Sequence, residues 1–218
     1  MSAEPKKSRS LKFTFGLITL IGIIAIVFIR IDTKIRETNR SEAYRNVRSF
    51  GCALYSFDDE YGSYPNESTV ALVDEVNPGH DYYLSGKSSN AAFRQLMAAS
   101  ITESEHILYA KIKNSIEPDG NISRGEALKK GEVGFSYICG LSSSGNPSTP
   151  VVLTPLIPGT TKFDSKPFKG KAVILHINNT VGIYDIHEDG HIYDKGINLL
   201  SSKHPIWKGK APNIRYPE

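Results

Sequence analysis

The fold of this chain is decided by residues 13–65, which read FTFGLITLIGIIAIVFI (13–29), RIDTKIRETNRS (30–41) and EAYRNVRSFGCALYSFDDEYGSYP (42–65). The first segment carries no charge, and its length is at the short end of the roughly 17–25 residues that span a bilayer core. Ile31 and the aliphatic stem of Arg30 lengthen it slightly. A buried helix of a soluble protein would show a polar face, which this run lacks. We therefore interpret residues 13–31 as a transmembrane helix.

A basic leader, residues 1–12, precedes the apolar run, as it does in a secretory signal peptide. A cleavage site would require small residues after the run, whereas Val27-Phe28-Ile29-Arg30 stand there, so the sequence indicates a permanent anchor. Basic residues also follow the run, at Arg30, Lys34, Arg36 and Arg40. They balance the leader, so the positive-inside rule does not decide the orientation.

The segment after residue 41 has the pattern of an amphipathic helix. Its apolar residues recur at alternating intervals of four and three, which places them on one stripe: Ala43, Val47, Phe50, Leu54, Phe57 and Tyr61. The helix is expected to stop at Gly62, because glycine adopts the left-handed conformation without steric cost. Tyr64 and Pro65 follow, and the proline prevents a restart. No helix breaker separates the apolar run from this extension, residues 32–65, so we predict one helix about 70 Å long at about 1.5 Å per residue.

The stretch from Asn46 to Pro65 resembles N-L-R-x-I-G-x-A-L-x-x-Y-x-x-D-x-G-x-Y-P, a pattern of bacterial pseudopilins, the type IV pilin-like subunits of type II secretion. The run from Phe15 to Ile26 looks like the F-T-L-I-E-L-[LIV]-x-x-I-A-I of their membrane helix. Beyond Pro65 the resemblance is looser and extends mainly to pseudopilin-like proteins of Verrucomicrobia and Planctomycetes. It implies an α+β, pilin-like ladle in which the long helix packs on a small antiparallel sheet.

Two positions depart from the prepilin motif of that family. Thr14 stands where a glycine precedes the cleavage site before Phe15, and Thr19 stands where the mature chain carries a glutamate. In the family, this glutamate is understood to pair with the N-terminus of a neighbouring subunit, since an unpaired charge in a bilayer costs several kcal/mol. This chain therefore lacks both the glutamate and the cleavage glycine that would lead to a free N-terminus at Phe15. We therefore expect an uncleaved chain whose leader remains part of the anchor.

Residues 66–218 are predicted to form one globular α+β domain with its sheet at about 134–193. Short helices are expected near 70–76, over 91–99 and over 126–130, whereas 106–113 fits either a strand or a helical turn. Strands are expected over 134–139 and 151–154, and a three-strand meander over 171–177, 180–186 and 191–193. Such a sheet would pack against the amphipathic stripe, because each has one apolar face to bury.

The densest set of potential metal ligands lies at the end of this meander: Asp185, His187, Glu188, Asp189 and His191. Two imidazoles with a carboxylate would suit zinc. The carboxylates would suit calcium, which the major pseudopilins bind in a C-terminal loop, although the EF-hand spacing is absent. A solvated polar turn explains the same residues without any ligand. We predict no metal and no cofactor, with calcium or zinc as the alternatives.

Cys52 and Cys139 are the only cysteines, and they form neither a CxxC motif nor a zinc pattern. They are compatible with one disulfide outside the cytoplasm or with two buried thiols. The run Ser142-Ser143-Ser144-Gly145 lacks the strand–turn–helix context of a nucleophile elbow. The net charge is only +3, and no basic block with interleaved aromatics indicates a nucleic-acid partner. We therefore predict no enzyme and no catalytic residue.

The resemblance implies a non-catalytic, single-pass subunit or accessory of a type II secretion or type IV pilus-like system. It would lie in the bacterial inner membrane, with a cytoplasmic leader and a periplasmic domain. Its partners would be membrane lipid, other pilin-like subunits and proteins of the secretion platform. The alternative is a membrane-tethered periplasmic binding domain that keeps the pilin-like fold without assembling. A third class is a membrane-anchored metal-dependent hydrolase that uses the late histidines.

Overall fold

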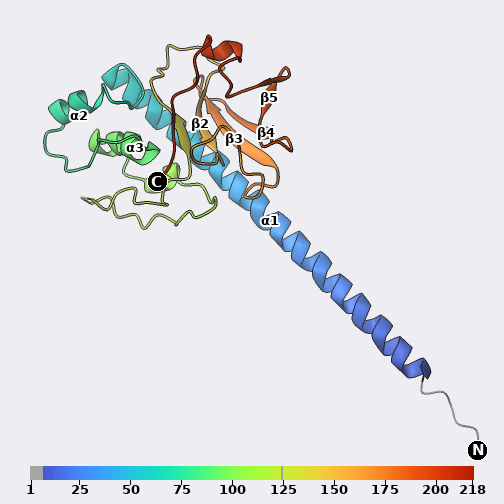
Figure 1. Cartoon of the computed structure of the whole chain (residues 1–218). Coiled ribbons are helices and arrows are strands. Elements are labelled where there is room, and N and C mark those ends of the chain that lie inside the picture. The colour runs from blue at the N-terminus through green and yellow to red at the C-terminus, as the bar shows by residue number, and fades with distance from the viewer. Residues whose placement is uncertain (1–6, 124) are drawn as a thin grey trace, which may run out of the picture.

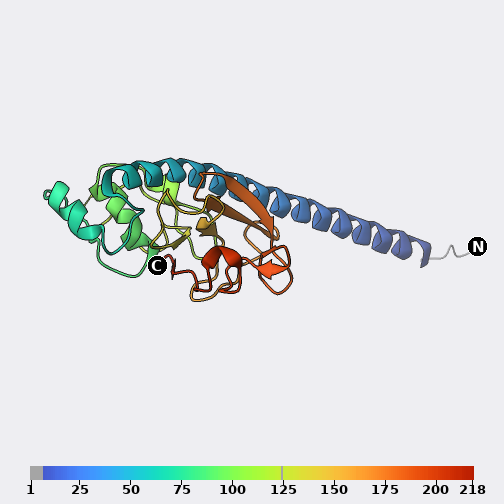
Figure 2. The same cartoon turned by 90° about the horizontal axis from the view of Figure 1, so that it is seen from above.

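The computed structural model describes residues 7–123 and 125–218, with side chains from residue 16 onward. One uninterrupted helix, α1 (Lys7–Tyr61), contains both the apolar run and the amphipathic extension. Its N-terminal half projects away from the globular part and its C-terminal half lies along it, as Figures 1 and 2 show. The prediction of a single long helix is therefore confirmed. Residues 1–6 of the leader lie outside the described part of the chain.

The main sheet has five antiparallel strands in the order β4-β3-β2-β1-β7. Their bounds are Ser136–Ile138 (β1), Pro150–Thr154 (β2), Lys171–His176 (β3), Val181–Asp185 (β4) and Ile214–Arg215 (β7). The class is α+β, and four of the strands were predicted. The predicted strand over 191–193 is wrong, because β5 (Tyr193–Asp194) pairs only with β6 (Ile197–Asn198) in a separate hairpin.

The shorter helices are α2 (Val70–Val76), α3 (Ser89–Ala98) and two 3-10 turns, η1 (Glu105–Leu108) and η2 (Pro205–Trp207). The helix expected over 91–99 begins earlier because the Ser88 hydroxyl accepts a hydrogen bond from the amide of Ala91, at 3.1 Å, and so caps α3. Of the two alternatives for 106–113, the structure has the helical turn, since η1 covers the start of this segment and no strand follows it there. Residues 126–130 form turns and not the predicted helix.

The hydrophobic core lies on both faces of the sheet. The stripe of α1 is buried against one face, and the side chains of Val47, Phe50, Leu54 and Phe57 are at most 1% exposed. Alternate residues of β3 point to opposite faces, as a strand requires. Val173 and Leu175 join the cluster under α1, while Ala172 and Ile174 join a second cluster that contains Trp207. The sheet is thus covered by α1 on one face and by the C-terminal segment on the other (Figure 2).

Gly51 sets how closely α1 approaches the turn between β3 and β4. A Cβ atom at this position would lie 1.9 Å from the Oδ1 atom of Asn179, which is in that turn. One helical turn further on, the Tyr55 hydroxyl donates a hydrogen bond to the Ile177 carbonyl oxygen. The hairpin is therefore fixed to the helix by the close approach of the Asn179 side chain to Gly51 and by the hydrogen bond of Tyr55.

The helix ends at the expected segment. Gly62 has φ 76°, in the left-handed region, and its amide donates to the Asp58 carbonyl oxygen at 2.7 Å. The Tyr64 amide then donates to the carbonyl oxygen of Leu141 at 3.1 Å, and the Tyr64 side chain is 1% exposed. The Tyr137 hydroxyl donates to the Pro65 carbonyl oxygen at 3.0 Å. These contacts attach the end of α1 to β1 and the loop that follows it.

Candidate functional site

The N-terminal half of α1 presents a continuous apolar surface. Between residues 17 and 31 every large apolar side chain is about half exposed or more: Leu17, Ile18, Leu20, Ile21, Ile23, Ile24, Ile26, Val27, Phe28, Ile29 and Ile31. This is the one helix, among the residues the structure describes, that is long and apolar enough to cross a membrane. A surface of this size is unusual for a monomer in water and marks a lipid or protein contact.

The three positions that were compared with a prepilin motif, Thr14, Phe15 and Thr19, fall at the start of this surface. Thr14 and Phe15 belong to α1, but their side chains lie outside the described part of the structure. Thr19 is exposed on the apolar half of the helix. Each of the three positions lies within the continuous helix α1.

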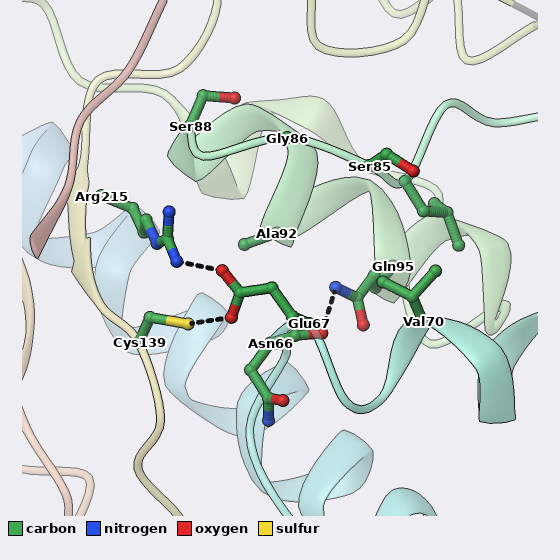
Figure 3. Close-up of a pocket in the computed structure, with 11 residues that line it drawn as sticks. Asn66, Glu67, Val70, Ser85, Gly86, Ser88, Ala92, Gln95, Cys139 and Arg215 are labelled. Atoms are coloured by element: carbon green, nitrogen blue, oxygen red, sulfur yellow. Dashed lines mark hydrogen bonds and ion pairs between the residues drawn. The ribbon is translucent and has the colours of Figure 1, made fainter. Parts of the chain in front are cut away.

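A cleft of about 200 Å³ lies between the segment that leads from α1 into α2, the helix α3 and the strand pair β1–β7 (Figure 3). Residues far apart in the sequence meet there: Glu67 from the segment before α2, Cys139 from the end of β1, and Arg215 from β7. The Glu67 carboxylate accepts a hydrogen bond from the Arg215 guanidinium through Oε1. Its Oε2 atom lies 3.5 Å from the Cys139 sulfur, which donates to it.

The chemistry of this cleft does not suit a nucleophilic reaction. Burial raises the pKa of the Cys139 thiol above its ordinary value of 9.0, and the neighbouring Glu67 carboxylate raises it further, against a lowering by Arg215. A reactive cysteine needs a lowered pKa, because the thiolate is the nucleophile. Cys139 is therefore a neutral thiol at neutral pH, and the Glu67–Arg215 pair joins the start of α2 to the C-terminal strand.

The floor of the cleft is a buried polar cluster built on Asn66, Thr69 and Gln95. The Thr69 hydroxyl lies 2.6 Å from the Gln95 Oε1 atom, and the Gln95 amide nitrogen donates to the Asn66 carbonyl oxygen at 3.0 Å. The Asn66 side chain in turn donates to the Tyr64 carbonyl oxygen at 2.8 Å. Because buried polar groups without partners are costly, this closed set of bonds fixes the chain as it leaves α1.

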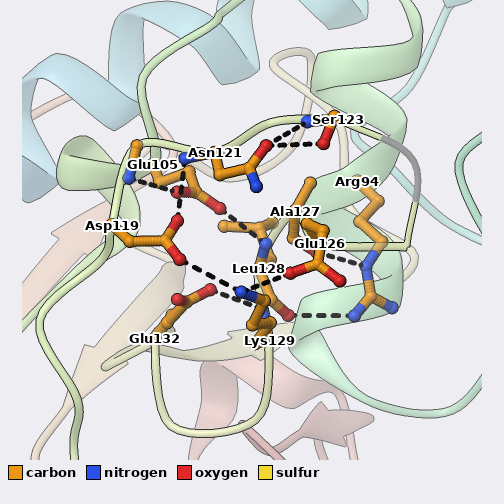
Figure 4. Close-up of polar contacts among 11 residues, drawn as sticks. Arg94, Glu105, Asp119, Asn121, Ser123, Glu126, Ala127, Leu128, Lys129 and Glu132 are labelled. Atoms are coloured by element: carbon orange, nitrogen blue, oxygen red, sulfur yellow. Dashed lines mark hydrogen bonds and ion pairs between the residues drawn. The ribbon is translucent and has the colours of Figure 1, made fainter.

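A second polar cluster holds the irregular segment between η1 and β1 (Figure 4). Its centre is Glu105, whose side chain is buried although it carries a carboxylate. The two carboxylate oxygens accept from the backbone amides of Leu128, at 2.7 Å, and Gly120, at 3.1 Å. Nearby, the Lys129 ammonium lies 3.0 Å from Asp119 and 2.5 Å from Glu126. These contacts organise a loop that has few backbone hydrogen bonds of its own.

Glu132 in this cluster gives a pH-dependent prediction. Burial is the main cause that raises its pKa above the ordinary value of 4.5; the hydrogen bond from the Lys129 amide lowers the pKa, and the charges of Glu105 and Asp119 raise it. A carboxyl whose folded pKa is raised favours folding when protonated, so its ionisation costs stability as pH rises above about 4.5. We expect Glu132→Gln, which keeps the acceptor for the Lys129 amide, to raise the melting temperature at pH 7 and to lose this advantage at about pH 4.

Thermal unfolding of the detergent-solubilised full chain at the two pH values measures this effect. The matched control is Glu188→Gln, which changes an exposed carboxylate and should shift the melting temperature little at either pH. An equal gain from Glu132→Gln at both values would contradict the assignment to ionisation.

The candidate metal ligands are used in other contacts. The Asp185 carboxylate pairs with the Lys171 ammonium at 2.5 Å. The Asp189 carboxylate accepts from the Tyr193 hydroxyl at 2.5 Å and from the His191 amide at 3.0 Å, and these bonds lower its pKa to about 2. The His187 ring stacks edge-on against Tyr193, and Glu188 is exposed. Within residues 7–123 and 125–218, no three His, Cys, Asp or Glu side chains are grouped to hold a metal.

The two cysteines do not form a disulfide, and they are not both buried. Both are free, with Cys52 exposed on α1 and Cys139 buried. Cys139 lies beside Pro65, thirteen positions after Cys52, so most of the last three turns of α1 separates the thiols. Nine residues of helix, from 52 to 61, already span about 14 Å, whereas the two Cα atoms of a disulfide are at most about 7 Å apart.

The cleft itself was not predicted from the sequence. Glu67, Gln95 and Arg215 stand in segments without a recognisable motif, and Arg215 reaches Glu67 only because β7 pairs with β1. The glycine and proline after Tyr61 give the one sequence indication, since they show where the chain must turn away from α1. Comparisons with protein-family models, with curated proteins and with solved structures found no match to this chain.

Proposed function

We propose that this protein is a non-catalytic, single-pass membrane subunit or accessory of a type II secretion or type IV pilus-like system. The observation that carries the proposal is α1, in which one uninterrupted helix supplies both an exposed apolar half and a buried stripe under the sheet. The anchor and the scaffold of the domain are thus one element, as the resemblance to pseudopilins implies. The membrane would be the bacterial inner membrane, with the domain in the periplasm.

The polar contacts of the domain support a structural role. In the cleft, Glu67 is paired with Arg215 and Cys139 is held as a neutral thiol. His176, the most central histidine of the sheet, has its Nδ1 atom 2.8 Å from the Ser148 carbonyl oxygen and its Nε2 atom 2.7 Å from the Tyr184 hydroxyl. Burial lowers its pKa, so it is a neutral ring between two hydrogen-bond partners.

The alternative is a tethered periplasmic binding domain that does not assemble. It is favoured by the residues at the prepilin positions, because Thr14 and Thr19 provide neither the cleavage glycine nor the membrane glutamate of the family. The open cleft beside Glu67 would then be the place to look for a ligand. Mass spectrometry of the protein extracted from membranes tests the shared premise of an uncleaved anchor, which a chain beginning at Phe15 would contradict.

A substitution at Gly22 separates assembly from simple tethering. Gly22 is exposed on the apolar half of α1, and a Cβ atom there would meet nothing within 4 Å of it. Helices pack closely in membranes where small residues let their backbones approach. We expect Gly22→Leu to leave the monomer folded and anchored, and to reduce crosslinking to pilin-like subunits or platform proteins by about tenfold, the effect of about 1.4 kcal/mol.

The experiment uses the full-length protein crosslinked in its native membranes, with partners identified by mass spectrometry. Ile23→Leu is the matched control, because it changes a neighbouring exposed side chain without changing its size. Recovery of such partners from the unchanged protein, and their loss only with Gly22→Leu, would support assembly. Recovery of a lone monomer would contradict assembly and favour the tethered domain.

A further inference from the structure

The base of the globular domain lies at the height of the lipid headgroups if α1 spans a bilayer. Residues 13–31 form about 28 Å of helix, which matches a hydrocarbon core about 30 Å thick. Arg30 and Ile31 then lie at the boundary of the hydrocarbon. The headgroup layer on each side is about 5–8 Å thick, so the next five or so residues of α1 cross it.

The loop before β3, residues 164–170, contacts α1 at this level. The Arg36 guanidinium donates to the Lys166 carbonyl oxygen, and the Lys169 ammonium lies 3.8 Å from the Glu37 carboxylate. The loop is held in place from inside, because Phe168 is fully buried in the core and the Gly170 amide donates to the Ser165 carbonyl oxygen at 2.7 Å. Figure 1 shows this end of β3 beside α1, where the helix leaves the domain. The loop is therefore held close to the level of the headgroups.

Several exposed cations at this level have no acidic partner. Arg30, Lys34 and Lys166 are exposed, and within the described residues no carboxylate lies in ion-pair distance of them. Two of the neighbouring acids have cationic partners: Asp32 pairs with Arg36 at 2.7 Å, and Asp185 pairs with Lys171. Asp164, which accepts from the Lys166 amide at 2.9 Å, and the exposed Glu188 of the adjoining loop have none among the described residues. Three cations without an acidic partner, Arg30, Lys34 and Lys166, therefore lie at this level against two such acids.

We propose that Arg30, Lys34, Lys166 and Lys169 form a membrane-proximal collar that binds the phosphates of anionic phospholipids. The two α1 residues extend from the helix, and the two loop lysines extend from the base of the sheet, so the collar contacts the bilayer from two elements. Each Lys or Arg near an anionic surface strengthens binding about fivefold, and salt weakens the effect. This inference rests on the membrane anchoring in the proposed function, and it does not depend on which side of the membrane the domain occupies.

The test is amide hydrogen exchange of residues 164–170 in the full-length protein, reconstituted in vesicles of phosphatidylcholine alone or with phosphatidylglycerol added. We expect exchange in this loop to slow in the anionic vesicles only, by about fivefold for each lysine in contact with the surface. High salt should remove the difference. The double variant Lys166→Gln and Lys169→Gln should also remove it, while the protein stays in the vesicles.

The matched control is Lys208→Gln with Lys210→Gln, beside η2 on the face of the sheet away from α1. The variant and its control each remove two exposed lysines. In each case one of the two has a left-handed backbone: Lys169, with φ 55°, in the variant and Lys208, with φ 50°, in the control. This control should keep the lipid-dependent protection of residues 164–170.

Equal exchange in the two kinds of vesicle, with the protein inserted in both, would overturn the collar while leaving the anchor intact. Protection that survives Lys166→Gln and Lys169→Gln would overturn it as well. A protein that fails to float with either kind of vesicle would instead contradict the membrane anchoring of the proposed function, and the collar with it. Flotation is therefore measured on every sample before exchange.

Discussion

The variant Gly134→Ala is expected to destabilise the domain by about 3 kcal/mol or more, a large part of the 5–15 kcal/mol that typically keeps a protein folded. A Cβ atom at Gly134 would lie 2.3 Å from the Ala110 amide nitrogen, 2.4 Å from its carbonyl oxygen and 2.7 Å from its Cα atom. All three are backbone atoms, so no side-chain rotation can relieve the overlap. The strand β1 or the segment after η1 would have to move.

Such a movement would break bonds on both sides of Gly134. Its amide donates to the Leu108 carbonyl oxygen at 3.1 Å, and its carbonyl oxygen accepts from the buried Thr154 hydroxyl at 2.8 Å. Thermal or urea unfolding of the detergent-solubilised full chain measures the loss. Gly79→Ala is the matched control, since a Cβ atom there meets nothing within 4 Å and the stability should change little. Equal stability of the two variants would show that the close approach to Ala110 is not required.

Phe50→Ala is expected to cost about 3–5 kcal/mol, as is usual when a fully buried phenylalanine is truncated. Phe50 projects from α1 into the centre of the core. Its ring centroid lies 4.6 Å from that of Phe93 in α3, in an edge-on arrangement, and 6.4 Å from that of Phe135 at the start of β1. One side chain thus joins the long helix to two other elements. Its loss should separate the domain from the helix before it affects the exposed apolar half of α1.

Limited proteolysis and unfolding of the full-length protein in membranes distinguish loss of domain packing from loss of membrane attachment. With Phe50→Ala, the globular domain should be digested readily while the protein remains in the membrane fraction. The neighbouring exposed residue provides the control, and Ser49→Ala should leave both properties unchanged. Loss of Phe50→Ala from the membrane fraction would contradict the separation of anchor and core that the exposed apolar half of α1 implies.

The elements that were predicted correctly have local, periodic patterns. The stripe of α1 repeats over several turns, and β3 and β4 are joined by a short turn, so neighbouring residues alone specify them. Strand β7 could not be predicted, because Ile214 and Arg215 form a strand only by pairing with β1. The predicted third strand of the meander failed for the converse reason. Its residues alternate, but Tyr193 and Asp194 fold back on β6 instead of continuing the sheet.

The cleft shows that the prediction of functional residues from the sequence has the same limit. Glu67 and Arg215 are 148 positions apart, and only the completed sheet brings their side chains together. The histidines and acids at 185–191 attracted attention because they are close in sequence. The structure pairs Asp185 with Lys171 and brings the Asp189 carboxylate within 3.3 Å of the His191 Nδ1 atom, without a third ligand among the described residues. A high density of ligand-type residues along the chain was therefore a poor guide to a site here. The apolar run, in contrast, predicted a surface that the structure leaves exposed between residues 17 and 31.

Because α1 is one continuous helix, it would transmit a tilt of its N-terminal half to the globular domain as a rigid rod. From Ile31 to Tyr61 the helix is about 45 Å long, so a tilt of about 10° at the membrane would swing its far end sideways by about 8 Å. Neither a proline nor a break in the helix is available between Ile31 and Tyr61 to absorb the rotation. Any force that neighbouring molecules exert on the membrane half would thus reach α3 and the cleft as a displacement, amplified by the length of the arm.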